Sequence, residues 1–149
     1  MLKSKKGFTL IEILVVIGII AILATIVLIA INPARQFKQA RDSQRTSNVN
    51  AVLNAIGQNL ADNQGLFTCS GTTTNLPTTT PTLMSNSGFD IYGCLVPTYL
   101  PDLPLDPVSG SFTGTTTYNS GYTVVQDVNG RVTVAAPDAE VATSIEVTR

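Results

Sequence analysis

One carboxylate, Glu12, lies inside an otherwise apolar stretch near the N-terminus, "KKGFTLIEILVVIGIIAILATIVLIAI" at residues 5–31. A carboxylate in such a segment costs free energy in a bilayer unless it lies near the interface or has a partner. Glu12 is about 6 Å along a helix from Phe8, where snorkelling to the headgroups lowers this cost. An interfacial position would account for a glutamate without a role, whereas a cationic partner would give the carboxylate a function.

Few other side chains in the sequence carry chemistry. The chain of 149 residues has no histidine, no tryptophan and two cysteines. It therefore lacks most of the groups used for proton transfer, metal binding and nucleophilic attack. This composition argues against an enzyme, and no cofactor is expected. Cys69 and Cys94 fit one disulfide in an oxidising compartment, with two buried unpaired thiols as the alternative.

The apolar stretch is long enough to span a membrane. As a helix, residues 8–31 would measure about 36 Å, against a hydrocarbon core of about 30 Å. The stretch is longer than the apolar region of a secretory signal peptide, and "AIN" at residues 30–32 is a poor cleavage site. Basic residues flank it on both sides, so charge alone does not decide its orientation. These residues are Lys3, Lys5 and Lys6 before it and Arg35, Lys38, Arg41 and Arg45 after it.

The segment "KGFTLIE" at residues 6–12 resembles the type IV prepilin signature, in which a short basic leader ends in glycine and the mature chain has phenylalanine first and glutamate fifth. This resemblance to type IV pilins and pseudopilins covers about residues 3–62. It implies that a prepilin peptidase cleaves between Gly7 and Phe8 on the cytoplasmic side and methylates the new amino group of Phe8. It also implies that Glu12, with Thr9 beside it in the motif, pairs with that amine on a neighbouring subunit during assembly.

After the apolar stretch, residues 32–64 are predicted to continue the helix in amphipathic form. Pro33 predicts a kink or short break near Asn32, because proline lacks a backbone donor and disfavours helical geometry in the preceding residue. The expected end of the helix is "DNQG", which finishes at Gly65. One apolar face is expected to pack on the distal domain and comprises Val49, Val52, Leu53, Ile56 and Leu60.

Four cations near the start of this second helical segment are expected to form a basic stripe. Lys38, Arg41 and Arg45 lie close together on a helical wheel, with Arg35 beside them. The favoured interpretation is a face exposed to headgroups or solvent just outside the membrane. The alternatives are pairing with acidic residues of adjacent subunits and contact with DNA during uptake. Asp42 within the stripe and the absence of interleaved aromatic residues weaken the DNA alternative.

The remaining residues, 65–149, predict a small head built on an antiparallel sheet. Residues 65–88, which contain "TTTNLPTTTPT", predict an exposed loop, and the three prolines of residues 98–110 predict an ordered loop. Strands are predicted over residues 115–118, 122–127 and 131–135. A two-residue hairpin turn is predicted at Asn129-Gly130, because both residues tolerate positive φ.

The loop "LPLDP" at residues 103–107 and the hairpin after it resemble, more weakly, the distal region of major pseudopilins, some of which bind calcium in the corresponding loop. Asp102, Asp106 and Asp127 supply oxygen ligands in principle. Their spacing matches no EF-hand, and aspartates in loops usually cap turns. The sequence therefore assigns no metal site.

Together these features predict an α+β fold, with a leader at residues 1–7 and a long N-terminal helix that is transmembrane over residues 8–31 and packs on a small antiparallel sheet. By resemblance, the chain is a structural subunit of a type IV pilus or related filament. Its expected partners are further copies of itself, the prepilin peptidase, an inner-membrane assembly platform and the membrane. It would wait in the cytoplasmic membrane as a single-pass protein, N-terminus inside, and then join a cell-surface or periplasmic filament.

Two alternatives stay open. The chain is also compatible with a major pseudopilin of a type II secretion filament or of a competence filament for DNA uptake. Outside the filament proteins, a monomeric membrane-anchored binding module has the same overall organisation.

Overall fold

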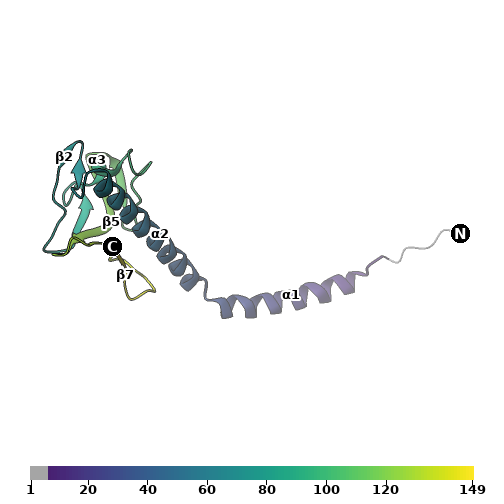
Figure 1. Cartoon of the computed structure of the whole chain (residues 1–149). Helices are drawn as coiled ribbons and strands as arrows, with labels where there is room; N and C mark the ends of the chain where they lie inside the picture. Colours follow the sequence, from purple (N-terminus) through teal and green to yellow (C-terminus); the bar gives the residue numbers. More distant parts are fainter. Residues whose placement is uncertain (1–6) are drawn as a thin grey trace. The chain divides into compact units, whose positions relative to one another are not determined.

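The computed structural model describes residues 7–149, so the predicted leader lies outside the described residues apart from Gly7. The chain divides into two units, one ending at Phe37 and one formed by Lys38–Arg149, here called the C-terminal unit. Figure 1 follows the elements along the chain. In order, they are α1 (Leu10–Ile31), α2 (Pro33–Asp62), β1 (Thr68–Cys69), β2 (Thr72–Thr73), β3 (Thr82–Ser85), α3 (Tyr92–Leu95), β4 (Ser111–Gly114), β5 (Thr117–Gln126), β6 (Val132–Ala136) and β7 (Ile145–Thr148). The predicted α+β class is confirmed.

A break at Asn32 separates α1 from α2, as Pro33 predicts. Asn32 has a positive φ of 47° at the C-terminal cap of α1, a conformation that asparagine tolerates better than most residues. Its carbonyl and side-chain oxygens both accept hydrogen bonds from the Arg35 N–H, at 3.1 and 3.4 Å. Pro33 takes the first position of α2, where a backbone N–H has no partner within the helix. These two residues therefore end one helix and begin the next.

No side chain of α1 is buried within the chain. Among the described residues, α1 is also the one helix long and apolar enough to cross a membrane. Large side chains such as Ile11, Leu14 and Ile29 are 64%, 55% and 79% exposed. So much apolar surface on one helix needs lipid or other apolar helices around it.

α2 packs on the C-terminal unit through the predicted apolar face. Val49, Val52 and Ile56 are fully buried and Leu53 nearly so, while Leu60 is partly buried against the same core. The helix ends at Asp62, and Gly65, with a φ of 88°, donates its N–H to the Leu60 carbonyl at 2.7 Å. A glycine in this conformation closes a helix C-terminus, so the expected stop is confirmed.

The main sheet is antiparallel, with the order β3-β5-β6-β7, and β4 pairs with the first residues of β5. Tyr122 and Val124 of β5 and Val132 and Val134 of β6 are buried in one core with the apolar face of α2. Burial alternates along β6, because successive side chains of a strand point to opposite faces of the sheet. One face of the sheet therefore builds the core together with α2.

The predicted strands over residues 115–118 and 122–127 are wrong in one respect, because the second half of the first and nearly all of the second belong to the single strand β5. The segment Asn119-Ser120-Gly121 has the composition of a turn, but it forms an irregularity within the strand. Gly121 has a φ of 78°, and the register between β3 and β5 shifts around it, as in a β-bulge. β4, which was not predicted, pairs with the start of β5.

The hairpin between β5 and β6 is confirmed, but its predicted two-residue turn is wrong. The Asp127 N–H donates to the Arg131 carbonyl at 2.8 Å, so three residues form the loop between them. Only Gly130 of these three has a positive φ, at 83°. After two-residue loops, three-residue loops with one glycine in the left-handed conformation are among the most common connections in β-hairpins.

The prediction of one exposed loop over residues 65–88 is also wrong. β1 and β2 form a short hairpin, and β3 is an edge strand of the main sheet with Met84 and Ser85 buried. Exposed residues remain at 70–73, in the Thr/Pro segment at 78–81 and at 86–88. These strands were not predicted because threonine is common both in polar loops and in strands.

A disulfide joins Cys69 of β1 to Cys94 of α3, 25 residues later. It ties the β1–β2 hairpin to the loop region before the prolines. Asn59 of α2 is buried beside it and donates to the carbonyls of Thr68 and Cys94 at 2.8 and 3.1 Å. The end of α2 and both cysteine-bearing segments therefore meet at one place.

Removing this disulfide is expected to lower the free energy of unfolding of the C-terminal unit by about 3 to 4 kcal/mol, because the unfolded chain regains the entropy of a loop of that length. The change is the double variant Cys69→Ser with Cys94→Ser, and the measurement is urea unfolding. Reductant should shift the wild-type transition and leave that of the variant in place. Equal midpoints for the wild type with and without reductant would contradict the pairing.

Candidate functional site

The residues of the N-terminal motif lie at the start of α1. Gly7 and Phe8 precede the helix outside regular secondary structure, and Phe8 is 85% exposed. A Cβ atom added to Gly7 would meet nothing within 4 Å. The peptide bond between these two residues is therefore accessible from outside the chain.

Thr9 and Glu12 form a reciprocal cap on the N-terminus of α1. The Glu12 carboxylate oxygen Oε2 accepts hydrogen bonds from the Thr9 N–H at 2.7 Å and from the Thr9 hydroxyl at 2.8 Å. The Thr9 hydroxyl oxygen accepts from the Glu12 N–H at 3.3 Å. A threonine at the cap with a glutamate three residues later is a capping box, which satisfies N–H groups that a helix start leaves unpaired. The cap places the carboxylate at the positive end of the helix dipole.

The cap leaves part of the Glu12 carboxylate available. Both bonds from Thr9 end on Oε2, and Oε1 accepts no hydrogen bond within residues 7–149. A carboxylate has room for about four hydrogen bonds, so Glu12 can accept from a further cationic donor without losing the cap. The structure thus brings Thr9 and Glu12 together and leaves Gly7 and Phe8 exposed beside them.

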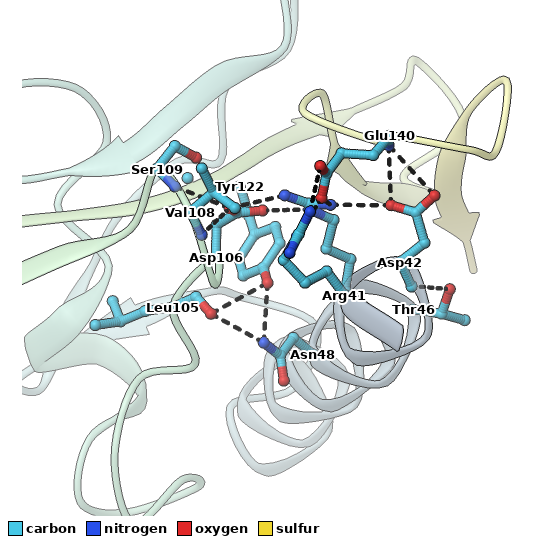
Figure 2. A network of polar contacts seen from close by, with 12 residues as sticks. Arg41, Asp42, Thr46, Asn48, Leu105, Asp106, Val108, Ser109, Tyr122 and Glu140 are labelled. Atoms are coloured by element: carbon cyan, nitrogen blue, oxygen red, sulfur yellow. Dashed lines mark hydrogen bonds and ion pairs between the residues drawn. The ribbon is translucent and has the colours of Figure 1, made fainter. Parts of the chain in front are cut away.

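A second polar site lies in the C-terminal unit, where five charged side chains form what is here called the Arg45 cluster: Arg41, Asp42, Arg45, Asp106 and Glu140. Figure 2 labels the other four members that surround Arg45. Arg45 is fully buried. Its Nε donates to Asp106 at 2.6 Å, and its Nη1 donates to Asp42 at 2.9 Å and to Glu140 at 3.0 Å. One guanidinium therefore joins three carboxylates that come from three separate segments.

The carboxylates of the Arg45 cluster also accept hydrogen bonds from the backbone of two loops. Asp42 accepts hydrogen bonds from the backbone N–H groups of residues 140–142, at 3.0, 2.7 and 2.9 Å. Asp106 accepts from the N–H groups of residues 108 and 109 at 2.8 and 3.0 Å. Figure 2 shows Asp42 facing the loop of Glu140 and Asp106 facing Val108 and Ser109. The cluster thus joins α2 to the proline-rich loop and to the segment before β7.

These contacts set the charge states of the cluster. Burial raises the pKa of Asp106, but the Arg45 hydrogen bond and the two loop N–H groups outweigh it and hold that pKa at about 2. Hydrogen bonds from Arg41 and then Arg45 lower the pKa of Glu140 to about 2. For Asp42, burial opposes ionisation, yet the three loop N–H groups and Arg45 hold its pKa well below the ordinary value. The Asp106 contact raises the pKa of Arg45. All members are therefore charged at neutral pH.

The predicted basic stripe is wrong for two of its four members. Arg45 is buried, and Arg41 pairs with Glu140 at 2.5 Å from Nε and 2.6 Å from Nη2. Both arginines thus pair with acids of the same chain. Arg35 and Lys38 are exposed, as predicted.

The roles of Asp42 and Glu140 were not predicted from the sequence. The spacing of three between Asp42 and Arg45 on one helix is a local signal for an ion pair. The partnership of Arg45 with Asp106, 61 positions later, has no local signal.

The three loop aspartates lie apart, and each accepts hydrogen bonds from its own surroundings. Asp106 gives its oxygens to Arg45 and two backbone N–H groups, and Asp127 accepts from the N–H groups of Asn129 and Arg131. Asp102 caps the N–H of Leu103 at 2.8 Å. Among residues 7–149, no group of three or more possible metal ligands converges. The oxygen ligands that the sequence offers are therefore used as caps and ion pairs.

Comparison with known proteins gives one match. Residues 2–28 match the family model described as the prokaryotic N-terminal methylation motif. No curated protein and no solved structure matches the chain. The matched residues include the exposed Gly7-Phe8 bond, the Thr9–Glu12 cap and most of α1. The chain therefore carries the signature of type IV pilins and pseudopilins, followed by an apolar N-terminal helix and an α+β head.

Proposed function

We propose that this protein is a structural subunit of a filament of the type IV pilus and pseudopilus class. In this proposal a prepilin peptidase removes residues 1–7 by cutting after Gly7 and methylates the new amine on Phe8. The subunit waits in the cytoplasmic membrane with α1 as its anchor and then polymerises through α1. The methylation motif over residues 2–28 is the observation that carries the proposal.

The geometry of the motif supports this role. Cleavage creates a cationic amine on Phe8, next to Thr9 and within the same helix start as Glu12. In a bundle of α1 helices this amine and the free Oε1 of a neighbouring Glu12 are both removed from water, and a charge-assisted hydrogen bond between them offsets the cost. The capping box holds the carboxylate in place before assembly.

The exposure of α1 favours a filament over a monomeric binding module. None of its 22 residues is buried within the chain. A helix that only anchors a domain needs to be compatible with lipid. This helix also carries a capped carboxylate in its first turn, and a cationic partner on a neighbouring subunit would offset the cost of that charge more fully than an interfacial position does. The subunit partners proposed are therefore further copies of this chain, brought together by an inner-membrane assembly platform.

The test is the intact mass of the protein extracted from membranes of its own cell. The expected mass is that of residues 8–149 with one added methyl group. Gly7→Val is expected to keep the full-length mass, because the protease no longer approaches the backbone closely, while the chain itself has room for the side chain.

Gly18→Ala is the matched control, since a Cβ at this exposed position of α1 also meets nothing within 4 Å. This variant should be cleaved and methylated like the wild type. Finding residues 1–7 still attached to the wild-type protein, with no methyl group on Phe8, would rule out the proposed function.

A further inference from the structure

We propose that the first turns of α2 bind the headgroups of anionic phospholipids through Arg35 and Lys38. The proposal rests on the membrane-anchored state described under the proposed function and goes beyond it, because it names a lipid class and the residues that recognise it. The ligand chemistry is a phosphate or other anionic group at the bilayer surface, contacted by one guanidinium and one ammonium.

Neither of the two cations forms an ion pair within residues 7–149. Both are exposed, and the ion pairs of residues 7–149 involve Arg41, Arg45 and Arg131 instead. Residues 1–6 contain no acidic residue. Arg35 and Lys38 are three positions apart on one helix, so their side chains lie on neighbouring parts of one face.

The nearest acid in the sequence cannot serve as that partner. Asp42, four positions after Lys38, is only 7% exposed and gives its oxygens to Arg45 and to three backbone N–H groups. Of the four cations in this region, the two in the Arg45 cluster are therefore neutralised by acids of the same chain. The other two, Arg35 and Lys38, remain available to bind an anion outside the protein.

The covalent connection to α1 sets the depth of these cations. α1 has 22 residues, which is about 33 Å of helix against a hydrocarbon core of about 30 Å. Arg35 and Lys38 follow Ile31 by no more than about 6 and 10 Å of helix, and the headgroup layer beyond the core is about 5 to 8 Å thick. Their long stems can extend along apolar surface, so both charges reach the phosphate level.

An aromatic residue accompanies the cations. Phe37 is 66% exposed although it is large and apolar. Aromatic side chains gather at the membrane interface, where the ring contacts the acyl boundary and the backbone remains near water. Exposure of Phe37 between two unpaired cations is the pattern of a helix start that lies in the interface.

Binding of anionic lipid affects the release of the subunit from the membrane. A filament removes the start of α2 from the bilayer surface, so the contacts with anionic lipid must break when a subunit leaves the membrane. Anionic lipid therefore stabilises the waiting subunit relative to the assembled one, by the linkage between binding and any equilibrium.

The experiment measures lipid selectivity of the full chain in phosphatidylcholine bilayers by electron spin resonance. Spin-labelled phosphatidylglycerol and spin-labelled phosphatidylcholine report their relative association with the protein. We expect a preference for phosphatidylglycerol, which falls about fivefold for each of Arg35→Gln and Lys38→Gln. Arg131→Gln, which removes an exposed cation of the β5–β6 hairpin, is the matched control and should leave the preference unchanged.

Equal selectivity in the wild type and in the double variant of Arg35 and Lys38 would overturn the proposal. A double variant with wild-type selectivity but reduced filament yield would instead assign these cations to acids of a second copy. Retention of the leader in the intact mass refutes the proposed function and leaves the lipid measurement standing, so the two failures are distinguishable. A chain that does not insert into bilayers overturns both.

Discussion

Replacing Arg45 with methionine is expected to lower the free energy of unfolding of the C-terminal unit by about 3 to 5 kcal/mol, the usual cost of leaving a buried charge without its partner. Methionine fills much of the space but leaves Asp106 buried with only backbone partners. The measurement is urea unfolding in mild detergent, followed by tyrosine circular dichroism. All four tyrosines lie in the C-terminal unit, so α1 does not contribute to the signal.

Gln44→Met is the matched control, because Gln44 is the exposed neighbour of Arg45 on α2. It should change stability by less than about 0.5 kcal/mol. Combining Arg45→Met with Asp106→Asn should restore part of the loss, since the amide carries no charge and keeps an acceptor for the loop N–H groups. An Arg45→Met variant as stable as the Gln44→Met control would contradict the role given to the cluster.

The stability of the Arg45→Met variant is also expected to depend on pH differently from that of the wild type. The pKa values of Asp106 and Glu140 are about 2 in the folded chain, below the ordinary values of 3.8 and 4.5. The wild type therefore has the full contribution of these groups above about pH 4.5 and loses it as the pH falls towards 2. Without Arg45 the pKa of Asp106 rises, so the loss of stability in this pH range should become smaller.

Replacing Glu12 with valine is expected to prevent filament assembly while leaving cleavage, methylation and membrane insertion intact. The variant removes the acceptor for the Phe8 amine of a neighbour, and a hydrogen bond to a charged group contributes about 1.5 to 3 kcal/mol. The concentration of subunits needed for assembly should therefore rise about 10- to 100-fold. Filaments sheared from cells with equal total subunit give the measurement.

One further substitution separates the charge of Glu12 from its cap. Glu12→Gln keeps an acceptor for Thr9 but has no charge, so it should assemble nearly as poorly as the valine variant. Glu146→Val is the matched control, because it removes an exposed glutamate from β7 without touching the motif. Wild-type filament yield from Glu12→Val would remove the assembly role proposed for the carboxylate.

The helices were predictable because their signals are local. The unbroken apolar composition of α1, the Asn32-Pro33 break and Gly65 at the end of α2 each depend on a few adjacent residues. The sheet was less predictable. Gly121 has the neighbours of a turn residue, and β5 continues through it because β3 pairs with residues both before and after it.

The sequence by itself determined the apolar helix, the position of Glu12 relative to Gly7 and Phe8, and the amphipathic face of α2. These depend on covalent spacing and helical periodicity, which tertiary contacts do not alter. Only the tertiary structure decided which cations of the basic stripe are buried and which are exposed. Whether an arginine is solvated or buried depends on which acids the fold brings to it. Asp106 and Glu140 reach Arg45 across 61 and 95 positions, whereas Arg35 and Lys38 meet no such acid among the described residues and stay exposed.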